Sequence, residues 1–428
     1  MADRKFGFDT LCLHAGQIPD AATGARAQPI YQTTSFVFDS ADHAASLFNL
    51  QTFGNVYSRI SNPTVAALEE RVAALEGGRA ALAAATGMAA QMLALLTLAR
   101  NGEHLVAART LYGGTYSQLA VTFAQFGIDA TFVDADDPAA FRAALRPNTK
   151  AVYAETIGNP QLNVCDIAAL AEVAHGAGIP LVIDNTLASP YLCRPFEHGA
   201  DIVIHSVTKY LGGHGTTMGG IVVESGKFPW DNGNFPQMTE PSRGYHGVRF
   251  HETFGDFGFT MKARMETMRT LGPTLAPLSA FLLLQGIETL HLRMPRHCET
   301  ALAVARQLAA HPAVEWVNYP TLDGNRYLTL ARRYLPHGAG GILTFGVRGG
   351  AKAGERFIEG VEMLSHLANV GDAKSLVIHP ASTTHRQLDL NEQRAAGVTP
   401  EMIRLSVGLE TPDDIMWDLD QALEKSQR

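Results

Sequence analysis

The sequence of 428 residues is poor in cysteine, in charge and in long apolar runs. Its four cysteines are widely spaced and form no CxxC pair, so they indicate reduced thiols rather than a disulfide framework or a metal site. Charged residues make up 18% of the chain and the net charge is −8, which argues against a nucleic-acid or anionic-membrane partner. No window approaches the roughly 18 consecutive apolar residues of a membrane span. The polar, charged start does not resemble a signal peptide, so we expect a cytoplasmic protein.

The length exceeds that of one ordinary domain, and an apolar fraction of 46% allows a large core. Short β-branched runs alternate with helical stretches through the first half of the chain. This alternation predicts an α/β layered protein with buried, mostly parallel strands. The expected strands lie near 105–107, 130–133, 151–154, 181–183, 202–204 and 220–223.

Other stretches depart from this alternation. Residues 1–60 are irregular, and residues 61–110 predict a helix starting at Pro63, a glycine-rich turn and a second helix before the first strand. Glycines and prolines through 225–260 predict a long ordered loop. We expect helices over 261–271 and 275–310, and beyond about residue 285 a smaller α+β unit with strands near 314–318, 342–347 and 403–407.

Two apolar runs end in residues that pyridoxal phosphate (PLP) chemistry requires. Residues 181–183 run into Asp184, and residues 202–204 run into a segment that contains Lys209. Ligands bind at the carboxyl ends of parallel strands, so an acid and an amine there can hold opposite ends of one planar cofactor. We expect Asp184 to keep the pyridine nitrogen protonated and Lys209 to bond to the cofactor aldehyde. Either residue alone is commonly structural, but the pair points to PLP.

A candidate phosphate site accompanies this pair. Gly87 and Met88, after Thr86, open an apolar helix whose N-terminus favours an anion, and the glycine lets the backbone approach a phosphate closely. Ser206 and Thr208 offer hydroxyl groups to the same phosphate. Each feature also has a structural interpretation, namely a helix cap at Thr86 and local capping of a turn at the two hydroxyls.

Three further side chains are candidates with open alternatives. Tyr112 follows the strand near 105–107 and either stacks on a flat cofactor or packs against neighbouring glycines. Arg59 suits a bidentate phosphate contact, although an isolated arginine is usually a surface residue. Arg404 lies in an apolar strand, where its charge needs a substrate carboxylate or a structural ion pair. The sequence has no GxGxxG fingerprint, which counts against a nicotinamide oxidoreductase, and no GxxxxGK[ST], GxSxG or HExxH motif.

Taken in order, these segments resemble the Cys/Met-metabolism family of PLP-dependent enzymes. The matching segments span nearly the whole chain, at 57–64, 86–90, 112–115, 184–186, 205–210, 379–382 and 403–410. The resemblance implies the PLP-dependent transferase fold type I, which is aspartate-aminotransferase-like, with a large, mixed, mostly parallel sheet domain and a smaller α+β C-terminal domain. It also implies a homotetramer built as a dimer of dimers.

The resemblance also implies a division of the chain and roles for its residues. Residues 1–60 would be an arm contacting the neighbouring subunit, 61–285 the PLP-binding domain with an insertion at 225–260, and 286–428 the C-terminal domain. Lys209 and Tyr112 would be catalytic, with Tyr112 stacked on the ring. The other cofactor-binding residues would be Gly87, Met88, Asp184, Thr186, Ser206 and Thr208, together with Tyr57 and Arg59 reaching the neighbouring subunit's site. The substrate-binding residues would be Arg404, Asn369 and Asn159, the last beside the cofactor's 3′-oxygen.

Within the family, the segments 225–260, 269–274, 367–372 and 383–386 resemble the O-acetylhomoserine sulfhydrylase branch. This implies PLP-dependent γ-replacement in methionine biosynthesis, in which O-acetyl-L-homoserine and sulfide give L-homocysteine and acetate. The alternatives are an O-succinylhomoserine donor, cysteine as acceptor (a cystathionine γ-synthase), a methionine γ-lyase, and a PLP-fold binding protein without activity. Gly114 and Asn369 weaken the lyase alternative, because lyases usually carry cysteine at the first position and many relatives carry serine at the second.

Overall fold

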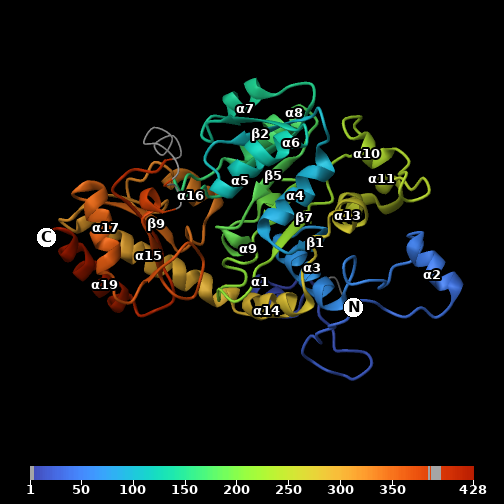
Figure 1. Ribbon diagram of the computed structural model, residues 1–428, viewed down its shortest axis with the longest axis horizontal. Helices are drawn as coiled ribbons and strands as arrows, with labels where there is room; N and C mark the ends of the chain where they lie inside the picture. The colour runs from blue at the N-terminus through green and yellow to red at the C-terminus, as the bar shows by residue number, and fades with distance from the viewer. Residues whose placement is uncertain (1–3, 384–385, 387–396) are drawn as a thin grey trace.

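The computed structural model describes residues 4–383, 386 and 397–428. Two β-sheets organise it, and Figure 1 shows the part coloured orange to red, which holds the smaller sheet, beside the part that holds the larger one. The larger sheet has the strand order β1-β7-β6-β5-β4-β2-β3. Its strands are β1 (Ala80–Ala84), β2 (His104–Ala108), β3 (Asp129–Val133), β4 (Thr149–Glu155), β5 (Leu181–Asp184), β6 (Ile202–His205) and β7 (Gly220–Glu224).

The larger sheet is mixed but mostly parallel, as the sequence predicts. Strands β6, β5, β4, β2 and β3 run parallel to one another, and β7 runs antiparallel to both β6 and β1. Strand β1 was not expected. Its sequence, AALAA, lies in an alanine-rich stretch, and alanine favours helix over strand. Pairing with β7 along five residues overrides that local preference.

The expected first two helices are present with the expected starts. Helix α3 (Pro63–Glu76) begins after Asn62, whose side chain accepts a hydrogen bond from Thr64 N at 3.0 Å. Helix α4 (Gly87–Leu98) begins after Thr86, whose Oγ1 accepts from Ala89 N at 3.0 Å. These are ordinary N-caps. The remaining helices of this part are α5 (Gly113–Ser117), η1 (Gln118–Thr122), α6 (Phe123–Gln125), α7 (Pro138–Ala144), α8 (Ile167–Gly176), α9 (Ser189–Leu192) and η2 (Pro195–His198).

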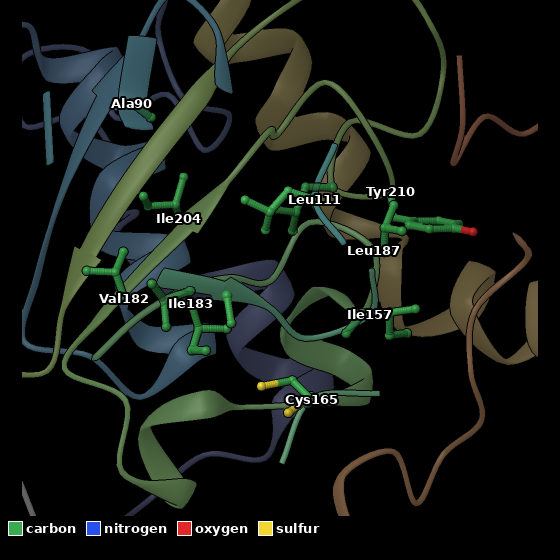
Figure 2. Close-up of a cluster of buried hydrophobic side chains, with 14 of the residues drawn as sticks. Ala90, Leu111, Ile157, Cys165, Val182, Ile183, Leu187, Ile204 and Tyr210 are labelled. Atoms are coloured by element: carbon green, nitrogen blue, oxygen red, sulfur yellow. The ribbon is translucent and has the colours of Figure 1, made fainter. Parts of the chain in front are cut away.

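Apart from the edge strand β3, the strands of the larger sheet are mostly buried on both faces. Figure 2 shows Val182 and Ile183 of β5 and Ile204 of β6 gathered with Ala90 of α4 and other apolar side chains. Strand β2 is buried at every position. Burial on both faces explains why these strands read as continuous β-branched runs rather than as alternating patterns.

The segment 225–260 holds short helical turns where a loop was expected. These are α10 (Pro236–Thr239), α11 (Phe250–Phe254) and η3 (Gly255–Phe257). The expected helix over 261–271 starts earlier, as α12 (Gly258–Lys262), and continues through the π-helical η4 (Ala263–Met268) into α13 (Arg269–Leu271). Aromatic packing folds the segment back on itself: the rings of Trp230 and Phe259 stack with centroids 5.3 Å apart. Glycine and proline counts alone do not reveal such contacts.

The smaller sheet has the order β10-β11-β12-β9-β8. The three expected strands are present as β8 (Val314–Asn318), β9 (Ile342–Val347) and β12 (Met402–Ser406), and β10 (Ser365–His366) and β11 (Leu376–Ile378) extend the sheet. The expected helix over 275–310 is two helices, α14 (Pro277–Glu288) and α15 (Leu290–Ala310). The helices that complete this part are α16 (Leu328–Tyr334), α17 (Gly350–Gly360), η5 (Pro380–Ser382) and α19 (Pro412–Ser426).

The N-terminal segment contains two short helices, α1 (Phe8–His14) and α2 (Ala41–Phe48). Helix α2 projects to the right of the larger sheet in Figure 1. Apolar side chains of this segment face solvent: Val37 is 95% exposed, and Ile18 and Phe53 are also largely exposed. All four cysteines are free and buried. In the part of the chain that the structure describes, no helix is long and apolar enough to cross a membrane.

Candidate functional site

The ends of β5 and β6 bring the predicted acid and the predicted hydroxyls together. These strands are parallel neighbours, with Asp184 opposite Ile204, so both chains leave the sheet at the same edge. Thr186 joins the two ends, because its N–H donates to Asp184 Oδ1 at 2.9 Å and its Oγ1 accepts from Ser206 N at 2.8 Å. Burial raises the pKa of Asp184, while the hydrogen bonds from Thr186 act in the opposite direction.

The N-terminus of α4 lies against the same strand end. A Cβ atom added to Gly87 would stand 2.7 Å from the Cβ of Ser206, so only glycine fits this approach. Thr208 closes the turn from the other side, since its Oγ1 donates to Gly219 O at 3.2 Å and accepts from Gly219 N at 3.0 Å. Backbone N–H groups at the start of a helix, with two hydroxyls beside them, suit a phosphate.

Lys209 and Arg404 converge from different sheets. Lys209 Nζ donates to Asn369 Oδ1 at 2.5 Å. Burial, and then the nearby charge of Arg404, lower the pKa of the lysine amine below its usual range. Arg404, on β12, donates to Asn159 Oδ1 at 3.2 Å, and burial lowers its pKa to about 10. Among the described residues, no carboxylate forms an ion pair with this guanidinium.

Tyr112 lies beside these residues. Its N–H donates to Glu155 Oε1 at 2.6 Å, the residue is 52% exposed, and its phenol lies near the guanidinium of Arg404. Glu155 is the last residue of β4 and stands opposite Asp184 of β5. The set of predicted side chains is therefore contiguous around the carboxyl edge of the sheet. Its members are all half-buried, while most of their chain neighbours are buried: Gly87, Met88, Asn159, Asp184, Thr186, Ser206, Thr208, Lys209, Asn369 and Arg404.

Sequence reasoning missed Glu155 and Tyr153. Tyr153 OH lies 3.5 Å from Asp184 Oδ2 and donates to Gln91 Oε1 at 3.0 Å. Burial, together with the charge of Asp184, raises the pKa of Glu155 well above its usual range. A usable signal was present, because Glu155 ends an expected strand just as Asp184 does.

Tyr57 and Arg59 do not lie among these strand-end residues. They line a hollow of about 690 Å³ between the N-terminal segment and residues that include Tyr245, Met261 and Arg269. Arg59 donates through its guanidinium to the backbone oxygen of Arg269, and its own backbone oxygen accepts from Thr274 Oγ1 at 2.7 Å. None of the strand-end residues described above lines this hollow.

The sequence profile described as "Cys/Met metabolism PLP-dependent enzyme" matches residues 9–424. The O-acetyl-L-homoserine sulfhydrylase of Leptospira meyeri is 54% identical, and the alignment covers 98% of this chain and 97% of that protein. The O-acetyl-L-homoserine sulfhydrylase 1 of Thermus thermophilus is 50% identical, with 97% and 99% covered. The homocysteine/cysteine synthase of Saccharomyces cerevisiae is also 50% identical, with 97% of each chain covered.

A crystal structure from Campylobacter jejuni subsp. jejuni superimposes on this chain with a TM-score of 0.95 at 40% identity, covering 98% of this chain and 100% of that one. That protein is assigned as an O-acetylhomoserine (thiol)-lyase and carries a pyridoxyl-lysine phosphate. The predicted fold type I, with its large mixed sheet and smaller second sheet, is thereby confirmed.

Proposed function

The chain belongs to the Cys/Met metabolism family of PLP-dependent enzymes, and from this we propose that it is a transferase that performs γ-replacement on O-acetyl-L-homoserine. Sulfide replaces the acetoxy group at Cγ, giving L-homocysteine and acetate, a step of methionine biosynthesis. The single observation that carries the proposal is the identity of about half of all residues, over nearly the full length, with several O-acetylhomoserine sulfhydrylases.

The residues at the sheet edge fit PLP. The glycine at 87 and the hydroxyls at 206 and 208 form a cradle at a helix N-terminus, where a phosphate is favoured. Asp184 offers a buried carboxyl at the next strand end, and Lys209 a partly desolvated amine. When bound, PLP supplies an electron sink that makes bonds at the substrate Cα and Cβ labile.

The protein's own groups would then act as follows. Arg404, with Asn369 beside the lysine, would bind the substrate α-carboxylate, because a buried guanidinium without a carboxylate needs an anion. The amine of Lys209 would take the Cα proton and later a Cβ proton, since its lowered pKa leaves more of the free base at neutral pH. Asp184 would hold negative charge opposite the pyridine nitrogen, and Tyr112 would cover the ring face. Asn159 would lie beside the 3′-oxygen.

A purified sample tests the reaction directly. Homocysteine should form from O-acetylhomoserine only when sulfide is present, and its amount should equal that of the acetate released. O-succinylhomoserine as donor, cysteine as acceptor and methionine alone serve as comparison substrates. Faster turnover of the succinyl ester, faster cystathionine formation, or keto-acid release from methionine alone would each replace the proposed activity by one of the alternatives.

We also propose that the chain works in the cytoplasm as a homotetramer, a dimer of dimers, divided into an arm (1–60), a PLP-binding domain (61–285) and a C-terminal domain (286–428). Tyr57 and Arg59 would serve the neighbouring subunit's site. The exposed apolar side chains of the arm, Val37 and Phe53 among them, support a covering partner. The four free thiols agree with a reducing compartment.

Subunit mixing tests the arm. Homo-oligomers of Lys209→Ala and of Arg59→Ala should each be nearly inactive. If Arg59 serves the neighbouring site, unfolding and refolding them together should restore activity in roughly a quarter of the sites, because half of the dimers are hybrids with one intact site each. No recovery, in a mixture whose hybrids are verified by mass, would place Arg59 in its own subunit's site.

A further inference from the structure

Glu155 is a buried acid at the sheet edge to which the family resemblance assigned no role. It ends β4 and stands in register with Asp184, which ends β5. Because in-register residues of neighbouring parallel strands project from the same face, the two carboxyl groups share one face of the sheet. Tyr153, two residues earlier, shares it as well. Only 6% of the surface of Glu155 is exposed.

The carboxyl group of Glu155 holds two backbone segments of the site. It accepts a hydrogen bond from the N–H of Tyr112, on the connection after β2, at 2.6 Å. It also accepts from the backbone N–H of Asn159, on the connection after β4. Asn159 in turn accepts from Arg404. The side chain of Glu155 therefore connects two loops. One loop carries Tyr112, which is expected to cover the cofactor ring, and the other carries Asn159, the hydrogen-bond partner of Arg404.

Tyr112 depends on this contact more than an ordinary loop residue would. It is the N-cap of α5, a five-residue helix, and its side chain makes no capping hydrogen bond. The residue is about half exposed, so packing alone does not define its position. The 2.6 Å bond to the Glu155 carboxyl thus fixes the backbone from which the ring projects.

The protonation state of Glu155 depends on the charges near its carboxyl group. Two carboxyl groups at adjacent strand ends cannot both be ionised cheaply in a buried setting. Burial and the charge of Asp184 outweigh the two backbone hydrogen bonds that Glu155 accepts, so the pKa of Glu155 lies well above its usual range, whereas Asp184 faces the proposed pyridine nitrogen, whose positive charge favours an ionised carboxylate. Within the described residues, no lysine or arginine forms an ion pair with Glu155. A neutral carboxyl group at 155 leaves the single negative charge on Asp184.

We propose that Glu155 is a positioning residue of this site: its neutral carboxyl group anchors the backbone of Tyr112, so that the tyrosine ring is held over the cofactor. The proposal rests on the proposed function for its kinetic readout. It also has a readout that is independent of the substrate, because the visible circular dichroism of bound PLP reports the asymmetry of the ring's surroundings.

Three substitutions test it. Glu155→Gln keeps an acceptor oxygen of the same reach without a charge, so kcat, KM and the dichroism of bound PLP should stay within about threefold of the unmodified protein. Glu155→Ala removes the acceptor and should lower kcat by roughly 100-fold, the cost of a displacement of about 1 Å, with a smaller effect on KM. Glu155→Asp, shorter by one methylene, should fall between them and serves if the alanine variant does not fold. The exposed Glu172→Ala is the matched control.

A double-mutant cycle separates positioning from an independent role. If Glu155 acts through the ring of Tyr112, Glu155→Ala should cost no more than about threefold when added to Tyr112→Ala, and both single variants should change the dichroism alike. Multiplicative losses, a glutamine variant as damaged as the alanine variant, or an alanine variant equal to the unmodified protein would each overturn the proposal. Inactivity of the unmodified protein with O-acetylhomoserine and sulfide would overturn the proposed function instead and leave the dichroism test standing.

Discussion

Removal of the guanidinium at position 404 should strongly weaken use of the amino-acid substrate and leave sulfide use unchanged. Arg404 lies on β12 and, among the residues that the structure describes, makes one hydrogen bond, of 3.2 Å to Asn159, and has no carboxylate partner. Burial lowers its pKa from 12.5 to about 10. That difference corresponds to roughly 3 kcal/mol of unfavourable burial, which a bound carboxylate is expected to offset.

The size of the effect follows from this free energy. Loss of about 3–4 kcal/mol of binding to a buried charge corresponds to a fall in kcat/KM for O-acetylhomoserine of roughly 100- to 1,000-fold in Arg404→Ala. Arg404→Lys keeps the charge but loses the planar fork, so we expect about a tenfold loss. The exposed Arg332→Ala, on α16, is the matched control and should change neither constant.

The assay is initial-rate kinetics with either substrate varied, with homocysteine and acetate quantified by mass spectrometry. 3-Aminopropyl acetate, which is the substrate without its carboxylate, provides a second test. The unmodified protein should prefer O-acetylhomoserine over this analogue by the same factor that the alanine variant loses. A kcat/KM for O-acetylhomoserine within about threefold of normal in Arg404→Ala, or an undiminished preference over the analogue, would refute the assignment.

Three further predictions concern the cofactor, the buried contact between Glu76 and His205, and pH. Lys209→Ala should abolish turnover and the visible absorbance of lysine-bound PLP, and persistence of both would refute the role of Lys209. Asp184→Asn should retain the absorbance but lose most of kcat, and a near-normal kcat would refute the assignment of Asp184 as the partner of the pyridine nitrogen. Glu76 and His205 are fully buried and joined by a 2.5 Å hydrogen bond, and Asn185 donates to the same carboxylate oxygen. Glu76→Ala should therefore lower the free energy of unfolding by about 3–5 kcal/mol, and an unchanged Tm would contradict this. Glu76→Leu combined with His205→Leu should recover part of the loss. Burial raises the pKa of Glu224 from 4.5 to about 7, so between these values the folded state keeps a proton that the unfolded state has released, and stability should fall as pH rises through the window. Scanning calorimetry from pH 4.5 to 7 should show a smaller fall in Tm for Glu224→Gln, and parallel curves would exclude Glu224 as the cause.

The sequence alone was informative where a chemically reactive side chain directly follows a predicted strand. Asp184 and the segment leading to Lys209 each follow a buried β-branched run, and parallel strands deliver their carboxyl ends to one edge. Their neighbourhood was therefore predictable before any coordinates. Thr86 as the cap of α4 and Asn62 as the cap of α3 were predictable for a similar reason, because capping is a local interaction.

Local reasoning failed where distant contacts outweigh local preference. Strand β1 is alanine-rich and forms only because β7 supplies its hydrogen-bonding partner. The turns within 225–260 are held by aromatic contacts such as that of Trp230 with Phe259, which no local pattern records. The roles of Tyr57 and Arg59 stay predictions, because the site they are expected to serve belongs to another subunit.

The order of strands and caps along the chain determined the α/β class, the helix that begins at Gly87, and the presence of an acid and an amine at one sheet edge, since each depends on residues close together in sequence. Tertiary structure decided which groups join them. Asn369 meets Lys209, and Glu155 meets Tyr112, across 160 and 43 residues respectively. Such contacts depend on strand register and on how the two sheets pack, and these follow from the sum of many weak interactions rather than from any local pattern.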